Sequence, residues 1–196
     1  VKKLYTRGGK NKTDEISVCQ DISFLIPYIN IVPEKFSDLL ITDNSSIIVR
    51  GELIMYESIF KKKYVPLGYN VARNTVVGQT RNLNVNIASD IHYIVYELIT
   101  DQAHPQMSPS KQFEKLSLMG FDVVPYINTK SVSIESLTVI LSDYRKKLDY
   151  FIDGLVIYSD NPYKRVTSGF PKHVIAFKIQ QEGETTRIKS IVWTVG

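Results

Sequence analysis

Three short stretches each combine an apolar, strand-like run with a charged side chain. They are Val49-Arg50-Gly51-Glu52, Ile152 to Ile157 with Asp153 near its start, and Ala176-Phe177-Lys178. Alternate residues of a strand share a face, so Lys178 should point with Ala176, and Asp153 away from Tyr158. A lysine or a carboxylate on a half-buried strand needs a partner. Taken singly, each stretch is more typical of a turn or a surface ion pair. The stretches indicate a functional site only when their order along the chain is considered.

The elements that must position these side chains follow from the pattern of apolar residues. Runs rich in β-branched and aromatic residues predict strands at Ser46–Arg50, Asp90–Leu98, Gly120–Tyr126, Gly154–Tyr158 and His173–Ile179. Helical spacing predicts helices over Asp21–Ile29, over Ser110–Leu118 with Ser110 as N-cap, and over Ser133–Leu148. The pattern is that of an α+β domain. Without a repeat or a long Gly/Ser linker, the sequence places no domain boundary inside the chain.

Composition narrows the class of protein. A chain of 196 residues with 43% hydrophobic residues can bury one substantial core. The single cysteine, Cys19, excludes a disulfide framework and a cysteine-based zinc knuckle within this segment. No apolar run approaches the roughly 20 residues that span a bilayer, and the first residues do not resemble a signal peptide. We therefore expect an intracellular domain without a membrane partner.

The charges alone do not identify a partner. The formal net charge is +4, so any polyanion would have to meet a local basic patch. Taken by themselves, Lys61-Lys62-Lys63 and Arg145-Lys146-Lys147 are read as solvated faces. The histidines share no metal-ligand spacing, and Ser110 and Ser168 stand in no nucleophile-elbow pattern.

Five motifs, read in order, carry a family resemblance. They are Thr6-Arg7-Gly8 with Asp14-Glu15 behind it, Val49-Arg50-Gly51-Glu52, Asn70-Val71-Ala72-Arg73-Asn74 with Gly78 and Arg81 behind it, Asp153–Ile157 preceded by Arg145, and Ala176-Phe177-Lys178. In this order the chain resembles the adenylation domain of bacterial and viral NAD-dependent DNA ligases, members of the covalent nucleotidyltransferase superfamily. The segment around Arg73 and Arg81 resembles the NAD-type branch most specifically.

The resemblance implies a fold and a reaction. The fold would be a nucleotidyltransferase fold, ATP-grasp-like, with antiparallel sheets flanked by helices. A lysine would attack the α-phosphorus of NAD⁺ and hold AMP. The AMP would pass to a DNA 5′-phosphate, and a 3′-hydroxyl would displace it to seal the nick. The resemblance thus implies NAD⁺ and Mg²⁺ as cofactors, nicked duplex DNA as partner, and the cytoplasm or the site of viral or bacterial DNA replication as location.

The resemblance also implies roles for single residues. Lys178 would contact the α-phosphate, where a cation stabilises developing charge. Glu52 would bind the ribose hydroxyls or a metal ion, and Asp153 would coordinate Mg²⁺ or orient the nucleophile. Guanidinium groups suit phosphates, so Arg7 and Arg73 would bind the nucleotide, and Arg81 and Arg145 the nicked DNA.

Three positions depart from the family pattern. No lysine in the chain stands in the Lys-x-Asp-Gly motif of the nucleophile, and Gly9-Lys10 replaces Asp-Gly after Thr6-Arg7-Gly8. Tyr158 stands where the family has a lysine near the adenine, and a tyrosine can stack on a base but cannot supply the cation. We expect the lysine motif to lie upstream and an OB fold with further domains to follow Gly196, so that residues 1–196 are a partial adenylation domain.

Two alternatives remain open. One is a catalytically inactive homologue that binds nucleotide or nucleic acid, and the other is a ligase that uses ATP or joins RNA.

Overall fold

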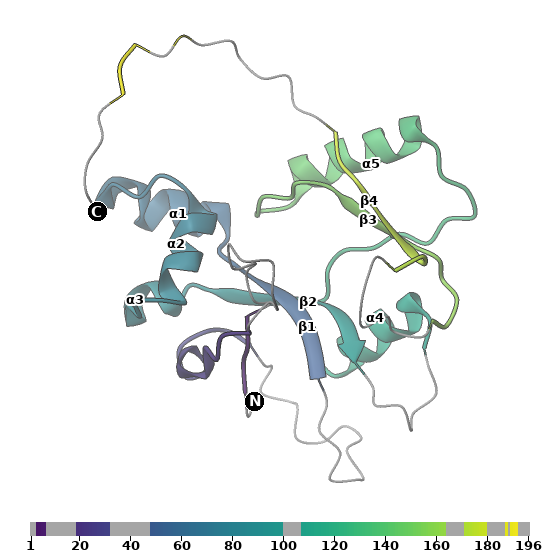
Figure 1. Ribbon diagram of the computed structural model, residues 1–196, viewed down its shortest axis with the longest axis horizontal. Helices are drawn as coiled ribbons and strands as arrows, with labels where there is room; N and C mark the ends of the chain where they lie inside the picture. The colour runs from purple at the N-terminus through teal and green to yellow at the C-terminus, as the bar shows by residue number, and fades with distance from the viewer. Residues whose placement is uncertain are drawn as a thin grey trace.

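The computed structural model describes residues 3–6, 19–31, 48–99, 107–163, 171–179, 187 and 189–191. Within them it is a mixed α and β structure with two small antiparallel sheets, β1–β2 and β3–β4, which confirms the α+β class. Figure 1 shows β1–β2 in the middle, with helices α1, α2 and α3 around one end, α4 at the other end, and β3–β4 with α5 above. No helix in these ranges is long and apolar enough to cross a membrane.

The first sheet pairs β1 (Ile48–Ile54) with β2 (His92–Ile99). The register runs from Ile54 opposite His92 to Ile48 opposite Ile99, and it shifts between Arg50 and Gly51. Gly51 lies opposite Val95 and Arg50 opposite Glu97, so Tyr96 is the extra residue of a β-bulge. A bulge bends its strand and changes the direction of a side chain, and this one lies within the Val49–Glu52 motif.

Three short helices that the apolar pattern does not predict cover one end of this sheet. They are α1 (Glu57–Lys63), α2 (Ala72–Gln79) and α3 (Val85–Ala88). They share one buried core with the segment around Leu25. In that segment the chain forms only a 3-10 turn, η1 (Ser23–Leu25). A second 3-10 turn, η2 (Val65–Leu67), follows α1. The helix predicted over Asp21–Ile29 is therefore wrong. Pro27 has no N–H and its ring blocks the preceding turn, so a helix cannot continue through it.

A polar contact fixes α1 to the start of β2. Asp90, only 9% exposed, accepts a hydrogen bond from Tyr64 Oη at 2.6 Å and bonds from Lys63 Nζ at 2.8 Å. Burial acts to raise the pKa of Asp90, but the bonds from Lys63 and Tyr64 hold it below its ordinary value. Lys63 is thus a structural partner rather than part of a solvated face.

The other end of the sheet packs against α4 (Pro109–Leu118), whose Leu116 lies in a second core with Val95 and Leu98. The N-cap of α4 is Ser108, not the predicted Ser110, because Pro109 occupies the first helical position, where its missing N–H costs nothing. The strand predicted over Gly120–Tyr126 is reduced to a single parallel bridge between Val123 and Val95. Pro125 cannot donate a ladder hydrogen bond, so the pairing stops there.

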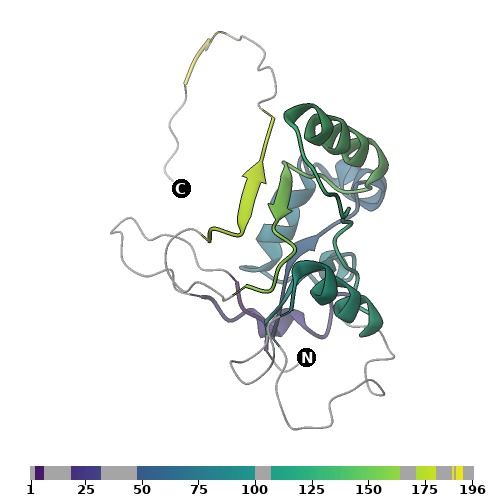
Figure 2. The same cartoon turned by 90° about the vertical axis from the view of Figure 1, so that its right-hand side faces the viewer.

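The second sheet pairs β3 (Leu155–Tyr158) with β4 (Val174–Phe177), both within their predicted ranges. Helix α5 (Ile134–Lys147) confirms the helix predicted over Ser133–Leu148, and Figure 2 shows it beside these strands. Its N-cap is Ser133, whose side chain forms a capping box.

Two aspartates that flank β3 join this part of the fold to the first sheet. Asp149 accepts a hydrogen bond from the backbone N–H of Ser58 at 3.0 Å, in the first turn of α1. Asp160 accepts bonds from the backbone N–H and the hydroxyl of Ser110, at 2.9 and 2.7 Å, in the first turn of α4. Neither helix is capped by the side chain of its own N-cap residue. A remote carboxylate therefore does the capping in both cases, and each cap is also a link between the two sheets.

Removing one link tests its contribution. Asp160→Ala should lower the free energy of unfolding by about 0.5–2 kcal/mol, as the loss of a helix cap does. The bond from the Ser110 N–H holds the pKa of Asp160 below its ordinary value. The stabilisation is therefore present above the unfolded-state pKa and is lost as the pH falls through the folded-state value. Chemical denaturation over a pH series measures both effects, with Asp143→Ala on α5 as the exposed control. A stability difference that persists in acid would contradict this prediction.

Candidate nucleotide-binding site

Asp153 of the fourth motif and Lys178 of the fifth, both predicted site residues, form a pair. Lys178 Nζ donates to Asp153 Oδ2 at 2.6 Å, and both side chains are more than half exposed. This hydrogen bond from Lys178 holds the pKa of Asp153 below its ordinary value, against a smaller opposing effect of burial. The carboxylate is therefore ionised at neutral pH and keeps an ammonium group oriented at a surface that a ligand can reach.

Gly154 permits this pair, because its missing side chain leaves room for Lys178. A Cβ atom placed on Gly154 would lie 2.8 Å from Cγ of Lys178 and would also collide with the carbonyl oxygen of Phe177. The backbone oxygen cannot move without shifting β4. The glycine of the Asp153–Ile157 motif is thus required by the close approach of β4 and its lysine.

Two of the predicted arginines lie at the same place. Arg145, at the end of α5, donates from Nη2 to the carbonyl of Asp153 at 3.2 Å and from Nε to that of Ile152 at 3.4 Å. Arg73, exposed in the first turn of α2, is close enough to contribute to the lowered pKa of Asp153. Residues from three motifs, far apart in sequence, therefore converge around Asp153.

The remaining predicted residues lie elsewhere or outside the described residues. Arg81 lies two residues beyond Gln79, the last residue of α2, so most of the length of this helix separates it from Arg73, by roughly 10 Å at 1.5 Å per residue. Glu52 is exposed on β1, opposite Ile94. Arg7 is outside the described residues.

Tyr158 lies at the other end of β3, in a half-buried cluster that the sequence did not reveal. Burial raises the pKa of Tyr158 to about 12, and the nearby Tyr163, Glu97 and Tyr96 add to the shift while Arg50 opposes it. The hydroxyl is therefore protonated at neutral pH and can donate a hydrogen bond. Glu97 is 13% exposed and pairs with Arg50 across the β1–β2 ladder at 2.8 Å. Arg50 belongs to the Val49–Glu52 motif identified in the sequence. Nothing in the sequence places Tyr96 or Glu97 beside Tyr158, because these contacts cross between sheets.

Tyr158 and Lys178 are at opposite ends of one strand face. Tyr158 pairs with Val174 and Val156 with Ala176, so these four side chains share a face, and Lys178 continues it above Gly154. Four residues of strand separate Gly154 from Tyr158, which is about 13 Å. Between them Val156 is 58% exposed. The face thus offers a cation at one end, an open apolar surface in the middle and a phenol at the other end.

The described residues contain no group of three or more histidine, cysteine or acidic side chains that could hold a metal ion. Magnesium is a cation that proteins often bind through only one or two carboxylates plus the phosphates of a substrate. Asp153 is exposed and ionised beside the cationic cluster, so its oxygens suit such a role.

An open strand face with basic groups at one end and an aromatic side chain at the other is suited to a ligand that carries both phosphate and base. The chain belongs to the NAD-dependent DNA ligase adenylation domain family, whose model matches residues 4–182. This confirms the resemblance carried by the five motifs, and the family implies the nucleotidyltransferase fold and the use of NAD⁺.

Individual relatives agree with this assignment. The chain is 35% identical to a DNA ligase of Acanthamoeba polyphaga mimivirus over 98% of its own length and 28% of that protein. It is 32% identical to a DNA ligase of Mycoplasmopsis agalactiae, over 99% of the chain and 29% of the relative. A DNA ligase of Clostridium tetani is 31% identical over 90% of the chain and 27% of that protein. The chain therefore spans less than a third of the length of these relatives.

Adding one methyl group at position 154 tests the geometry around Lys178. Gly154→Ala should weaken the binding of AMP about tenfold, because overpacking against the Phe177 carbonyl costs about 1–3 kcal/mol and moves the lysine. Calorimetric titration with AMP measures the change. Gly78→Ala is the matched control, since a Cβ on this helical glycine would meet no atom within 4 Å. Equal affinities of both variants and the unaltered chain would contradict the assigned role of Gly154.

Proposed function

We propose that this chain is the nucleotide-handling part of an NAD-dependent DNA ligase. It would bind the AMP portion of NAD⁺ while a lysyl-AMP intermediate forms, and would present the AMP to the 5′-phosphate of nicked DNA. The observation that carries the proposal is the Lys178–Asp153 pair at one end of an open strand face that has Tyr158 at its other end. Membership of the family supports it.

Lys178 and Arg73 would act on the α-phosphate. Phosphoryl transfer spreads negative charge over the phosphate oxygens, and fixed cations nearby lower the barrier because they need no reorganisation. Lys178 is held in place by its 2.6 Å bond to Asp153, and Arg73 lies near the same carboxylate. The pair thus prepares a cationic position without a ligand, which is the preorganisation that such a step requires.

Asp153 and Glu52 would serve the ribose and the metal ion. A carboxylate accepts hydrogen bonds from ribose hydroxyls and also suits magnesium. Glu52 is exposed on β1, in the sheet opposite the Lys178 face, and the oxygen atoms of Asp153 are partly exposed beside the lysine. When bound, magnesium would neutralise phosphate charge at this end of the site.

Tyr158 would contact the base from its end of the strand face. The hydroxyl stays protonated, and the neighbouring Tyr96 is directed by the bulge in β2. Aromatic rings bind bases by stacking, and a phenol adds a hydrogen bond at its tip. Together these features provide a base position that does not require the lysine found in the family pattern.

Arginines would bind the phosphates of DNA. Arg81, exposed beyond the end of α2, would contact nicked DNA away from the nucleotide. Arg7, by contrast, is proposed to bind the phosphates of the nucleotide, and only the family resemblance supports this role. Arg145 is predicted to contact DNA, and its bonds to the carbonyls of Ile152 and Asp153 give it a positioning role as well.

Substitution of Lys178 tests the nucleotide site. Lys178→Met should weaken the affinity of the chain for AMP and NAD⁺ about tenfold, because a charge-assisted bond to phosphate contributes about 1.5–3 kcal/mol. Calorimetry with AMP, NAD⁺ and ATP measures the change, and Lys130→Met, exposed and far from the site in sequence, is the control. Undiminished binding by Lys178→Met would contradict the proposed site.

The reaction itself needs the Lys-x-Asp-Gly segment. In a protein that joins such a segment to this chain, labelled NAD⁺ should leave AMP on the protein and ATP should not. Labelling by ATP would favour the ATP-using alternative. Salt-dependent binding to nicked duplex without labelling by either nucleotide would favour the inactive homologue.

Two variants of Tyr158, which should lose different amounts of affinity for AMP, test its role. Tyr158→Phe keeps the ring and should reduce the affinity for AMP a few-fold through the lost hydrogen bond, whereas Tyr158→Ala should reduce it about tenfold or more by removing the stacking surface as well. The comparison uses the same titration, with inosine monophosphate added to report on base recognition. Unchanged affinity in both variants would remove Tyr158 from the site.

A further inference from the structure

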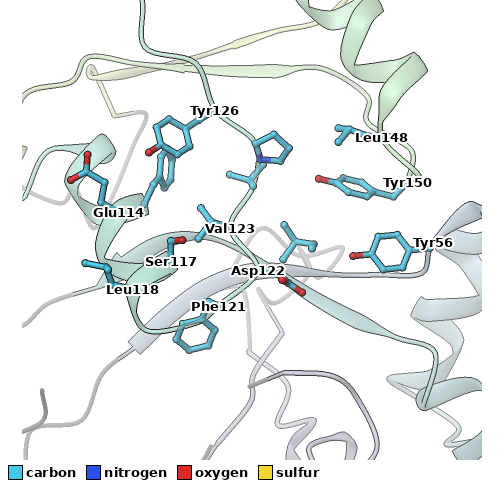
Figure 3. Close-up of a pocket in the computed structure, with 14 residues that line it drawn as sticks. Tyr56, Glu114, Ser117, Leu118, Phe121, Asp122, Val123, Tyr126, Leu148 and Tyr150 are labelled. Carbon is cyan, nitrogen blue, oxygen red and sulfur yellow. The ribbon is translucent and has the colours of Figure 1, made fainter. Parts of the chain in front are cut away.

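A groove of about 940 Å³ lies between α4, the segment 121–126 and the chain that follows α5. Figure 3 shows Tyr126 and Glu114 on one side, Tyr56, Leu148 and Tyr150 on the other, and Asp122 between them. None of the residues proposed for the nucleotide site lines it. The groove is therefore a second concave surface, separate in composition from the face that carries Lys178.

The lining has a consistent chemistry. Five of its 14 side chains are aromatic, and its charged members are the carboxylates Glu114 and Asp122, without a lysine, arginine or histidine. The carboxylate of Asp122 contributes to a raised pKa of Tyr56, after a larger effect of burial, so it lies near that hydroxyl. Carboxylates and aromatic faces both attract cations. In a chain with a formal net charge of +4, this groove is a local acidic surface.

The floor of the groove also has backbone groups that bond to no other described residue. The bridge to β2 uses the carbonyl of Asp122, which accepts from Val95 N–H at 2.8 Å, and the N–H of Val124, which donates to Val95 at 2.9 Å. Backbone groups of an extended chain alternate in direction, so the N–H and C=O of Val123 point away from β2. Among the described residues neither forms a hydrogen bond. An extended peptide could pair with them.

We propose that this groove binds an extended peptide segment of a protein partner that carries lysine or arginine among apolar residues. The apolar side chains would lie on the rings of Tyr126 and Tyr150, and the cations would meet Glu114 and Asp122. The same two carboxylates repel phosphate, so the groove does not suit nucleic acid.

Charge reversal in the peptide tests the proposal. Two fluorescent peptides of equal length are titrated with the 196-residue chain, one alternating lysine with valine and the other glutamate with valine. The lysine peptide should bind, more weakly as salt rises, and the glutamate peptide should not. Fluorescence anisotropy measures both. Equal binding of the two peptides, or binding of neither, would overturn the proposal.

Variants locate the binding surface. Glu114→Gln combined with Asp122→Asn should weaken the lysine peptide about fivefold, whereas Glu135→Gln combined with Asp143→Asn, both exposed on α5, should have no effect. Tyr126→Ser should weaken it through lost stacking, and thermal unfolding verifies that each variant is folded. Equal effects of the two double variants would overturn the assignment to the groove.

Competition separates this proposal from the nucleotide site. Neither NAD⁺ nor AMP should displace the lysine peptide, and Lys178→Met should leave its affinity unchanged. Displacement by either nucleotide would overturn the proposal, because it would make the groove part of the nucleotide site. Failure of the peptide to bind would leave the AMP titrations unaffected.

Discussion

The capping of α1 and α4 by Asp149 and Asp160 is the interaction on which the arrangement of the two sheets depends. Each helix begins without a capping side chain of its own and presents free N–H groups. Each aspartate stands at one side of β3 and supplies the missing acceptor. The N–H groups at these helix ends are thereby bonded by carboxylates that lie 91 and 50 positions away in the sequence. The two buried clusters of the first sheet contain no residue of β3 or β4 among the described residues, so these two caps are important links between the small sheet and the larger structure.

This arrangement explains why the candidate site has two ends. Near the Asp149 link, the Lys178–Asp153 pair lies beside Arg73 of α2. Near the Asp160 link, Tyr158 lies beside Tyr96, Glu97 and Arg50 of the first sheet. The first end therefore combines residues beside the second sheet with an arginine of α2, and the second end combines a tyrosine of β3 with residues of the first sheet. A nucleotide bound as proposed would contact both ends, with its phosphate and its base held by different chemistry.

Part of this could be predicted from the sequence and part could not. The strands that hold Asp153 and Lys178 were predicted because short, strongly apolar runs bounded by glycine and charge have few alternatives. Helices α1 to α3 were missed because they are short and α1 and α2 begin without a capping side chain, so their stability comes from tertiary contacts. Tyr96 and Glu97 were missed because the bulge that directs them exists only in the pairing of β1 with β2. Cross-sheet neighbours have no signal in spacing along the chain.

The formal net charge of +4 gives no sign that the chain has two surfaces of opposite charge. Lys178, Arg73 and Arg145 gather at one end of the strand face, whereas Glu114 and Asp122 lie in the groove beside α4. Averaged over the chain these charges nearly cancel, so composition alone favours neither a polyanion nor a cationic partner. Close-range electrostatics depends on local charge, since screening removes the influence of groups more than about 8–10 Å away. The two proposed interactions, phosphate at one surface and a basic segment at the other, therefore each depend on local charge and not on the net charge of the chain.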